Sequence, residues 1–237
     1  MLETTQLHSL FVAEVTGVDL RRPVDPEMLR QIEAALDRYA VLVFHGQALS
    51  NDEQIAFSAQ LGPLETTRQA HRPGARLRLD RHMSDISNLD ENSQLMTRDD
   101  HRRMSGLANR LWHTDSSFKR APAKYSLLSA HVVPSAGGET EFADLRAAYD
   151  ALPDAKQALL EGVVAEHSIY NSRATIGFTD FTPEERAALP PVPQVLVRTH
   201  PGSGRKTLYL ASHAASIQGM PLPEGRMLLL DLLEHAT

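Results

Sequence analysis

The chain has 237 residues, of which 42% are hydrophobic, and it carries a formal net charge of −6 at pH 7. This composition suits a globular core and excludes a general nucleic-acid binder, which would carry a basic footprint. There is no cysteine, so disulfides, iron–sulfur clusters and thiol nucleophiles are excluded. Eleven histidines allow a metal site with nitrogen and oxygen ligands. We see neither a membrane-spanning apolar run nor a secretory signal, so we expect a cytoplasmic protein without membrane contact.

The first elements are predicted from hydrophobic periodicity and capping signals. Residues 10–20 are rich in β-branched residues and predict a strand that runs into a turn. Apolar residues on one helical face predict a helix over 25–40, and residues 41–44 predict a buried strand. Residues 50–62 predict a second helix, because they open with a Ser-x-x-Glu capping box and close on a glycine.

Residues 69–107 are polar and irregular, apart from a short strand expected near Ile86. A loop of this length in a compact domain is either functional or disordered, and both an active-site lid and a solvated loop remain open. The loop is rich in arginine: Arg72, Arg76, Arg78, Arg81, Arg98, Arg102 and Arg103. Together with Lys119 and Arg120, these side chains are candidates to meet an anionic substrate.

After the loop, residues 125–134 have the composition of a strand, and a Gly-Gly turn then delivers Thr140 to the start of the next one. Helices are predicted from Asp144 and after Pro153, where proline favours a helix start.

Two β-rich runs around residues 201–204 predict a hairpin, and residues 223–237 predict a final helix. Because we find no repeat, low-complexity tract or linker, we expect a single domain over residues 1–237. Strands and helices that do not alternate strictly favour a β-rich α+β fold.

The triplet His113-Thr114-Asp115 is a candidate metal site. If this stretch is extended, side chains two apart point to the same side, so His113 and Asp115 converge. One imidazole and one carboxylate are two corners of the facial triad that holds iron(II) with positions open for a cosubstrate and oxygen. The spacing alone is weak evidence, because short motifs arise often by chance.

The surrounding residues are more specific. The stretch LWHTDSSFKRAPAKYSLLSAHVVPSAGGETEFADLRAAYDAL resembles the core signature of the TauD/TfdA family of iron(II)- and 2-oxoglutarate-dependent dioxygenases. The early stretches EVTGVDL and VLVFHGQALSNDEQIAFSAQLGPLE, and the later GFTDFT and VRTHPGSGRKTLYLASHA, extend the resemblance over nearly the whole chain. Within the family, the chain most resembles the branch that oxidises 2,4-dichlorophenoxyacetate.

The resemblance implies a fold and a set of site residues. The fold would be a double-stranded β-helix, a cupin-like jelly roll with flanking helices. His113 and Asp115 match the first two iron ligands, and Thr140 matches the threonine whose hydroxyl contacts a carboxylate of 2-oxoglutarate. Further candidates on the substrate side are Ser117, His200 and His213, although each histidine taken alone is more often structural.

The implied activity is the hydroxylation of an aryloxyalkanoate such as 2,4-dichlorophenoxyacetate, with Fe(II), 2-oxoglutarate and O2. The products would be a phenol, glyoxylate, succinate and CO2, as in aromatic compound catabolism and herbicide degradation. Within the family, the alternative is a sulfonate or alkyl sulfate dioxygenase of the TauD type. From other classes, a zinc hydrolase and a non-catalytic module that binds small acids remain open. Substrate, enantiomer preference and oligomeric state, including a homo-oligomer, are not determined by the sequence.

The family pattern also has a distal histidine as third iron ligand and, about ten residues later, an arginine that pairs with 2-oxoglutarate. Both follow a helix like the one predicted over 223–237, and we find no substitute for them in the sequence. We therefore expect these two residues and some C-terminal strands to lie beyond Thr237. We expect the dioxygenase activity from the longer protein and little or no turnover from residues 1–237 alone.

Overall fold

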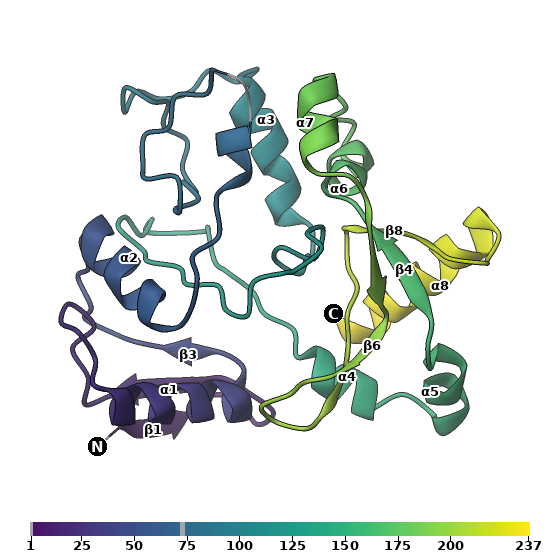
Figure 1. The fold of residues 1–237 in the computed structure, drawn as a ribbon, viewed down its shortest axis with the longest axis horizontal. Helices are drawn as coiled ribbons and strands as arrows, with labels where there is room; N and C mark the ends of the chain where they lie inside the picture. The colour runs from purple at the N-terminus through teal and green to yellow at the C-terminus, as the bar shows by residue number, and fades with distance from the viewer. Residues whose placement is uncertain (1, 72–73) are drawn as a thin grey trace. The chain divides into compact units, whose positions relative to one another are not determined.

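The computed structural model describes residues 2–71 and 74–237. Its contacts divide the chain into two compact units, each built from separate segments. The first unit comprises Met1–Leu64, Tyr125–Ala151 and Thr199–Thr207; the second comprises Glu65–Lys124, Leu152–Arg198 and Leu208–Thr237. Figure 1 follows the chain through its helices and strands, whose labels are used below.

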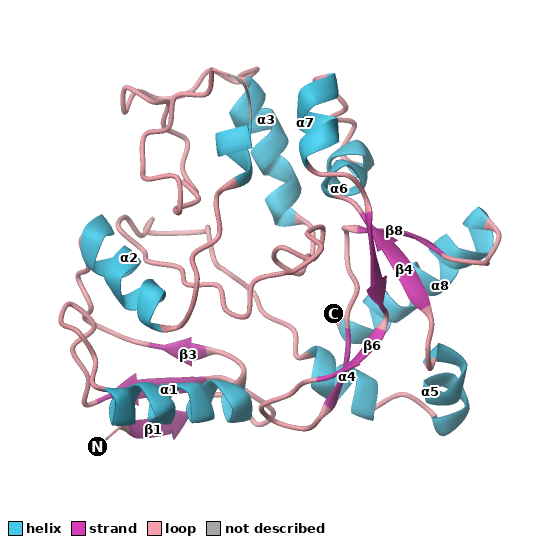
Figure 2. Cartoon of the chain, viewed as in Figure 1, coloured by secondary structure: helices cyan, strands magenta, loops and turns pink. Residues whose placement is uncertain are grey.

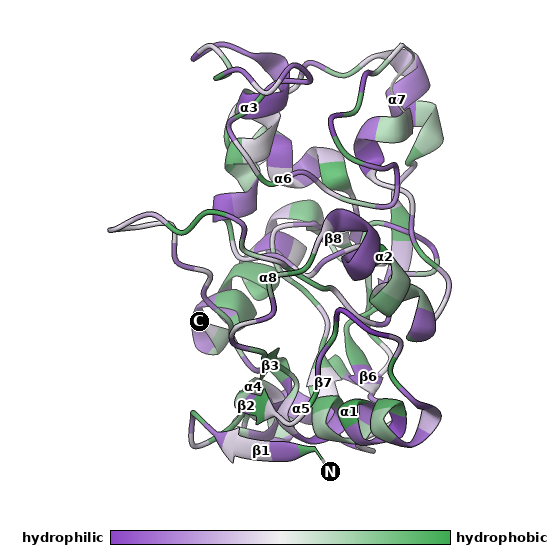
Figure 3. Cartoon of the chain, turned by 90° about the vertical axis from the view of Figure 1, so that its left-hand side faces the viewer, coloured by the Kyte–Doolittle hydropathy of each residue, from purple (hydrophilic) through white to green (hydrophobic). Residues whose placement is uncertain are grey.

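In the first unit, a three-stranded sheet has the order β1-β2-β3, formed by β1 (Glu3–Gln6), β2 (Ala13–Thr16) and β3 (Leu42–Val43). The pairing of β1 with β2 is antiparallel, and the pairing of β2 with β3 is parallel. Helix α1 (Pro26–Tyr39) forms the connection between β2 and β3. Figure 3 shows hydrophobic and hydrophilic residues together on α1, as expected for an amphipathic helix that covers a core.

The helix ends in this unit confirm one predicted capping signal, the Ser50/Glu53 capping box. Asp25 caps α1, and helix α2 (Asn51–Gln60) begins with the complete Ser50/Glu53 capping box. Helix α4 (Leu145–Asp150) begins after Asp144, whose side chain accepts from the backbone N–H of Arg146. The core to which α1 and α2 contribute contains the buried side chains Leu20, Val24, Ile32 and Phe57.

In the second unit, β4 (Val164–His167) lies between β5 (Val192–Val195) and β8 (Ala214–Ile217) and is antiparallel to both. Helix α8 (Leu222–Ala236) packs against β8 and fulfils the prediction of a final helix. The other helices of this unit are η1 (Arg68–His71), α3 (His101–Gly106), η2 (Leu107–Arg110), α5 (Asp154–Leu160), α6 (Ile169–Thr175) and α7 (Pro183–Ala188).

The predicted hairpin is present. Strands β6 (Val197–Thr199) and β7 (Lys206–Leu208) form a two-stranded sheet, and the backbone N–H of His200 donates to the carbonyl of Arg205 across its turn. The ring nitrogen Nδ1 of His200 accepts from the backbone N–H of Ser203 at 3.2 Å. His200 therefore helps to close this turn.

Three predicted strands are wrong. Residues 125–134 and the segment that contains Thr140 have no strand assignment and lie in long loops, which Figure 2 shows in pink. Near Ile86 there is only an isolated bridge between Leu89 and Leu95. β-branched composition favours a strand only where a neighbouring strand completes the hydrogen bonds, and these segments pair with no strand among residues 2–71 and 74–237.

The arginine-rich loop is ordered around one carboxylate. Asp85 accepts two hydrogen bonds from Arg78, at 2.7 and 2.8 Å, and one from Arg102 at 3.0 Å. Helix α3 lies at the end of this loop, in a stretch for which we predicted no helix. Arg72, one of the predicted cationic candidates, lies outside the described residues.

The observed fold is mixed α+β, as predicted at that level. Its sheets are not resolved as a double-stranded β-helix, so the jelly-roll topology stays a prediction. The single domain also stays a prediction, because two compact units can belong to one domain. Across residues 2–71 and 74–237, no helix combines the length and the apolar character needed to cross a membrane.

Candidate functional site

The side chains of His113 and Asp115 converge, as the triplet predicted. Their nearest atoms, Nε2 of His113 and Oδ1 of Asp115, are 3.3 Å apart. The convergence does not come from a regular strand, because Asp115 lies in a turn that the positive φ of Ser116 (57°) continues. Both side chains reach solvent, with 30% and 57% of their surface exposed.

The second ring nitrogen of His113 fixes how the ring is presented. Nδ1 lies 2.8 Å from the carbonyl oxygen of Leu111, which can only accept, so Nδ1 carries the proton of that bond. Nε2 is thus directed toward Asp115 and is the nitrogen available to a metal. Metal-binding histidines commonly use their other nitrogen in this way.

The turn that carries Asp115 is held by two side chains. The side-chain amide of Gln194, on β5, donates to the carbonyls of Ser117 at 2.9 Å and Lys119 at 2.8 Å. Glu65 accepts from the hydroxyl of Ser116 and from the ammonium group of Lys119, both at 2.7 Å. Such bonds fix the backbone that follows Asp115 and limit where its carboxylate can lie.

Two further bonds tie this segment to residues 210–213. The hydroxyl of Thr114 donates to the carbonyl of Leu210 at 2.9 Å, and the backbone N–H of Ser212 donates to the carbonyl of Trp112 at 3.0 Å. His213 follows directly, with its ring centroid 6.0 Å from that of His113 and 5.0 Å from that of Phe118. The structure therefore brings His213 to the His113/Asp115 pair.

The charges of the site are set by burial and by this pairing. The hydrogen bond to Asp115 raises the pKa of His113, against the opposing effect of burial. Burial lowers the pKa of His213 to about 3, and the positive charge of Arg173 acts in the same direction. His213 is only 2% exposed, so it is a neutral imidazole at pH 7.

The remaining predicted residues lie in different surroundings. Ser117 is fully buried, and its hydroxyl has no hydrogen-bond partner in the part of the chain that the structure describes. Thr140 and His200 belong to the other compact unit, where Thr140 is exposed in the loop after Gly137 and Gly138. Their predicted roles at the substrate and cosubstrate stay predictions.

Sequence reasoning missed Arg173, a buried arginine on α6. It is 6% exposed, and burial, followed by the nearby charge of Arg68, lowers its pKa to about 10. No periodicity, cap or motif pointed to it, because its burial comes from contacts with segments distant in sequence. The guanidinium of Arg173 donates to Asn109, on η2, at 2.9 Å.

Within the described residues, no three His, Asp or Glu side chains are placed to hold a metal ion together. His113 and Asp115 supply two donors, and their 3.3 Å separation is close to the roughly 3 Å expected between neighbouring ligands of an octahedral ion. The pair therefore fits two corners of a facial triad.

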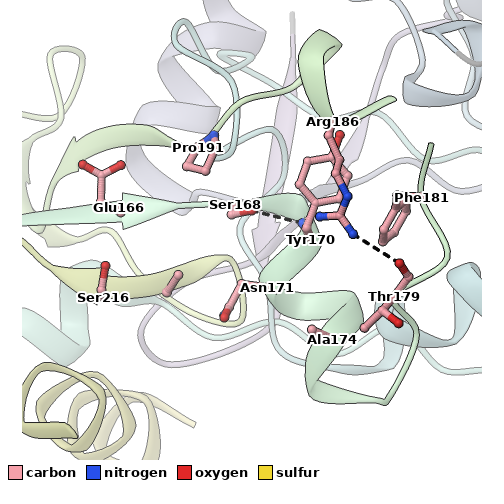
Figure 4. Close-up of a pocket in the computed structure, with 11 residues that line it drawn as sticks. Glu166, Ser168, Tyr170, Asn171, Ala174, Thr179, Phe181, Arg186, Pro191 and Ser216 are labelled. Carbon is pink, nitrogen blue, oxygen red and sulfur yellow. Dashed lines mark hydrogen bonds between the residues drawn. The ribbon is translucent and has the colours of Figure 1, made fainter. Parts of the chain in front are cut away.

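A pocket of about 470 Å³ lies elsewhere in the second unit (Figure 4). The guanidinium of Arg186 lies over the rings of Tyr170 and Phe181 and donates to the carbonyl of Thr179. None of the predicted site residues lines this pocket. Its lining consists of Glu166, Ser168, Tyr170, Asn171, Ala174, Thr179, Phe181, Arg186, Pro191, Ala215 and Ser216.

The family model described as taurine catabolism dioxygenase TauD, TfdA family, matches residues 3–237. The chain belongs to the TauD/TfdA family of dioxygenases. It is 50% identical, over 98% of its length and 80% of the relative's, to the alpha-ketoglutarate-dependent 2,4-dichlorophenoxyacetate dioxygenase of Cupriavidus pinatubonensis. It is 37% identical, over 97% of its length and 77% of the relative's, to the (S)-phenoxypropionate/alpha-ketoglutarate-dioxygenase of Sphingobium herbicidovorans.

A solved structure agrees. The crystal structure of AAD-2 in complex with Mn(II) and N-oxalylglycine matches with a TM-score of 0.90 and 48% identity, over the whole of this chain and 81% of that one. The predicted family is confirmed, and the chain is a dioxygenase of that family.

Proposed function

We propose that this protein is an Fe(II)- and 2-oxoglutarate-dependent dioxygenase that hydroxylates aryloxyalkanoates such as 2,4-dichlorophenoxyacetate. O2 provides one oxygen atom to the substrate and one to succinate, and 2-oxoglutarate loses CO2. Hydroxylation of the carbon beside the ether oxygen gives a hemiacetal, which collapses to a phenol and glyoxylate. All atoms are accounted for by these four products.

The observation that carries this proposal is the agreement between the family match and the geometry of His113 and Asp115. The 50% and 37% identical relatives are named for aryloxyalkanoate substrates, which supports the same class of substrate here. The converging imidazole and carboxylate support a metal with nitrogen and oxygen ligands, for which Fe(II) is a suitable ion.

Bound Fe(II) supplies the oxidising chemistry with O2 and 2-oxoglutarate. The chain's own residues supply placement. His113 would bind through Nε2, because Nδ1 is engaged by Leu111, and Asp115 would bind through its carboxylate. Gln194 holds the turn that presents Asp115, and neutral, buried His213 with Phe118 forms an adjacent wall that excludes water.

The finer predictions belong to the same proposal. We propose that the sheets are parts of a double-stranded β-helix in a single domain and that the hydroxyl of Thr140 contacts 2-oxoglutarate. Ser117, His200 and His213 are proposed to lie toward the substrate. The third iron ligand and the arginine partner of 2-oxoglutarate, which the family resemblance implies, have no assignment among the described residues.

The test is an assay of the protein expressed from its complete reading frame, with Fe(II), 2-oxoglutarate and 2,4-dichlorophenoxyacetate. We expect release of 2,4-dichlorophenol coupled to succinate formation and O2 uptake. His113→Ala and Asp115→Ala should each lower turnover about a hundredfold or more, because even outer partners of metal ligands are worth 10–100-fold.

A matched control is His45→Gln, which replaces a histidine whose side chain is 70% exposed and lies 3.7 Å from Glu14. It should keep wild-type turnover. Turnover that persists in both the His113 and the Asp115 variant would contradict the proposed metal site, and an absence of phenol release from the complete wild-type protein would contradict the substrate class.

A further inference from the structure

Arg173 is a buried cation whose hydrogen-bond partners are neutral. Its Nη1 donates to the hydroxyl of Ser172 at 2.8 Å, and its Nη2 donates to the side-chain carbonyl of Asn109 at 2.9 Å. Its Nε is buried without a partner among the described residues. None of the ion pairs found in residues 2–71 and 74–237 gives Arg173 a carboxylate.

Burying a guanidinium that has only neutral partners lowers the stability of the fold. Removing an ion from water costs free energy that a counter-ion normally offsets, and two neutral hydrogen bonds offset only part of it. A second cation adds to the cost of burying this charge, because Arg68 lies near enough to lower the pKa of Arg173 further. The surroundings of Arg173 are therefore electropositive and suited to an anion.

The position of Arg173 relates this charge to the candidate site. Its helix, α6, packs against η2 and β8. The backbone N–H of Ser168 donates to the carbonyl of His213 at 2.8 Å, and the side-chain amide of Asn171 donates to the carbonyl of Ser212 at 3.1 Å. At the other end, the partner of Arg173 is Asn109, four residues before His113.

We propose that Arg173 provides the counter-charge for a carboxylate that binds beside His113 and Asp115. This inference rests on the proposed function, which supplies two carboxylate ligands: the aryloxyalkanoate and 2-oxoglutarate. The planar guanidinium has five N–H donors, of which the fold uses two in the bonds above, so donors remain for a carboxylate. Arg173 thus selects an acid over a neutral ligand of the same shape.

The first experiment measures binding without turnover. Thermal unfolding of the complete, metal-free protein is followed by differential scanning calorimetry with three probes: phenoxyacetate, 2-oxoglutarate and the neutral analogue phenoxyethanol. We expect at least one of the two acids to raise the melting temperature and phenoxyethanol to have little effect. Arg173→Gln should remove most of the response to that acid.

The second experiment assigns the carboxylate. In the complete enzyme with Fe(II), Arg173→Gln should raise the KM of one ligand about ten- to hundredfold, the range for a hydrogen bond to a charged group, with a smaller effect on kcat. A raised KM for the aryloxyalkanoate assigns its carboxylate to Arg173. A raised KM for 2-oxoglutarate assigns the cosubstrate instead.

Two further variants keep the test decisive. Arg186→Gln removes an exposed arginine of the same unit that lies over aromatic rings, and it should keep the wild-type responses. If Arg173→Gln does not fold, Arg173→Lys keeps the charge but lacks the planar fork, and it should bind the carboxylate several-fold more weakly. Unchanged affinity for both acids in whichever Arg173 variant folds would overturn the inference. The role of Arg173 would then be limited to the hydrogen bond that joins α6 to η2.

The two proposals can fail separately. If the complete wild-type protein does not oxidise aryloxyalkanoates but its stabilisation by an acid still depends on Arg173, the proposed function fails and the carboxylate site stands. If it oxidises them and Arg173→Gln leaves both KM values and the thermal response unchanged, the proposed function stands and the carboxylate site fails.

Discussion

The two buried arginines of the described chain, Arg146 in the first unit and Arg173 in the second, have opposite surroundings. Arg146 faces Asp144 through two hydrogen bonds, from Nε at 3.0 Å and from Nη2 at 3.2 Å. Its Nη1 donates to the backbone carbonyl of Asp37 at 2.9 Å. Arg173 has a hydroxyl and an amide carbonyl in the corresponding places.

The difference separates a structural arginine from a binding arginine. The charge of Arg146 is neutralised inside the fold, and the same Asp144 also caps α4, so the pair has a complete role in folding. The charge of Arg173 is not neutralised by the fold, so its cost is reduced when an anion binds. Burial alone does not distinguish the two residues, and only the partner does.

The largest expected effect comes from breaking the Arg146 pair. Asp144→Asn should lower the free energy of unfolding by about 3–5 kcal/mol, because it leaves a buried guanidinium without its counter-charge. Asparagine caps helices as well as aspartate does, so the loss reports the ion pair and not the cap. Urea unfolding followed by far-ultraviolet circular dichroism, with hydrogen exchange over α4 to localise the change, measures it.

The matched change in the other unit is Arg173→Met, which keeps the apolar stem and removes the charge. Because no carboxylate is left unpaired and a costly buried charge is removed, we expect its free energy of unfolding in the absence of ligand to fall by no more than about 1 kcal/mol. A loss as large as that of Asp144→Asn would mean that Arg173 is paired within the fold, which contradicts the comparison.

The fold was predictable where its signals are local. The capping box of Ser50 and Glu53 lies entirely within one turn of sequence, and α2 begins where it predicted. Residues 125–134 have strand composition, yet a strand also needs a partner that no local pattern supplies, and no strand of the described part of the chain pairs with them. Helix α7 also begins with a capping box, formed by Thr182 and Glu185. We predicted no helix for the short stretch that follows this box.

The site was predictable in part for the same reason. His113 and Asp115 are two residues apart, so their convergence follows from local geometry, even though a turn produces it instead of a strand. The approach of His213 depends on the bond from Ser212 to Trp112, which joins segments a hundred residues apart. Arg173 could not be found from sequence, because its lack of a counter-ion is a property of the packed structure.

The stability of the two units should also respond differently to a fall in pH. Burial, the largest single influence, raises the pKa of Asp144, but the hydrogen bonds from Arg146 together outweigh it, so the net pKa lies below the ordinary 3.8. That contribution to stability is present above pH 4 and is lost as the pH falls further. Burial, followed by the charge of Arg198, lowers the pKa of His167 from 6.5 to about 4. The unfolded chain then takes up the proton first, so stability around His167 falls between pH 6.5 and pH 4.

His167→Gln, which is neutral at every pH, measures this second effect. We expect the free energy of unfolding of wild type to fall by about 3 kcal/mol more than that of the variant between pH 7.5 and pH 4, from 1.36 kcal/mol per pKa unit. Unfolding in urea is followed by the fluorescence of Trp112, which lies in the same compact unit as His167. His213 adds a slope of the same sign to both proteins, so the difference between them is the quantity to use. Parallel pH profiles would show that folding does not lower the pKa of His167.

The smallest expected effect compares one motif in the two units. Ser50→Ala on α2 and Thr182→Ala on α7 each remove the hydroxyl that accepts from the third helical N–H, at 3.3 and 3.2 Å, and each should cost about 1 kcal/mol. Helix α7 has six residues against ten in α2, so its hydrogen exchange should rise along its whole length, whereas in α2 the rise should stay within the first turn. Ser50→Gly and Thr182→Gly are the controls, because glycine is a tolerated cap and should cost only a few tenths of a kcal/mol. If exchange in α7 is unchanged by Thr182→Ala, then the packing of Tyr170 against Phe181 and the hydrogen bond from the Tyr170 hydroxyl to the Glu185 carbonyl hold that helix without its cap.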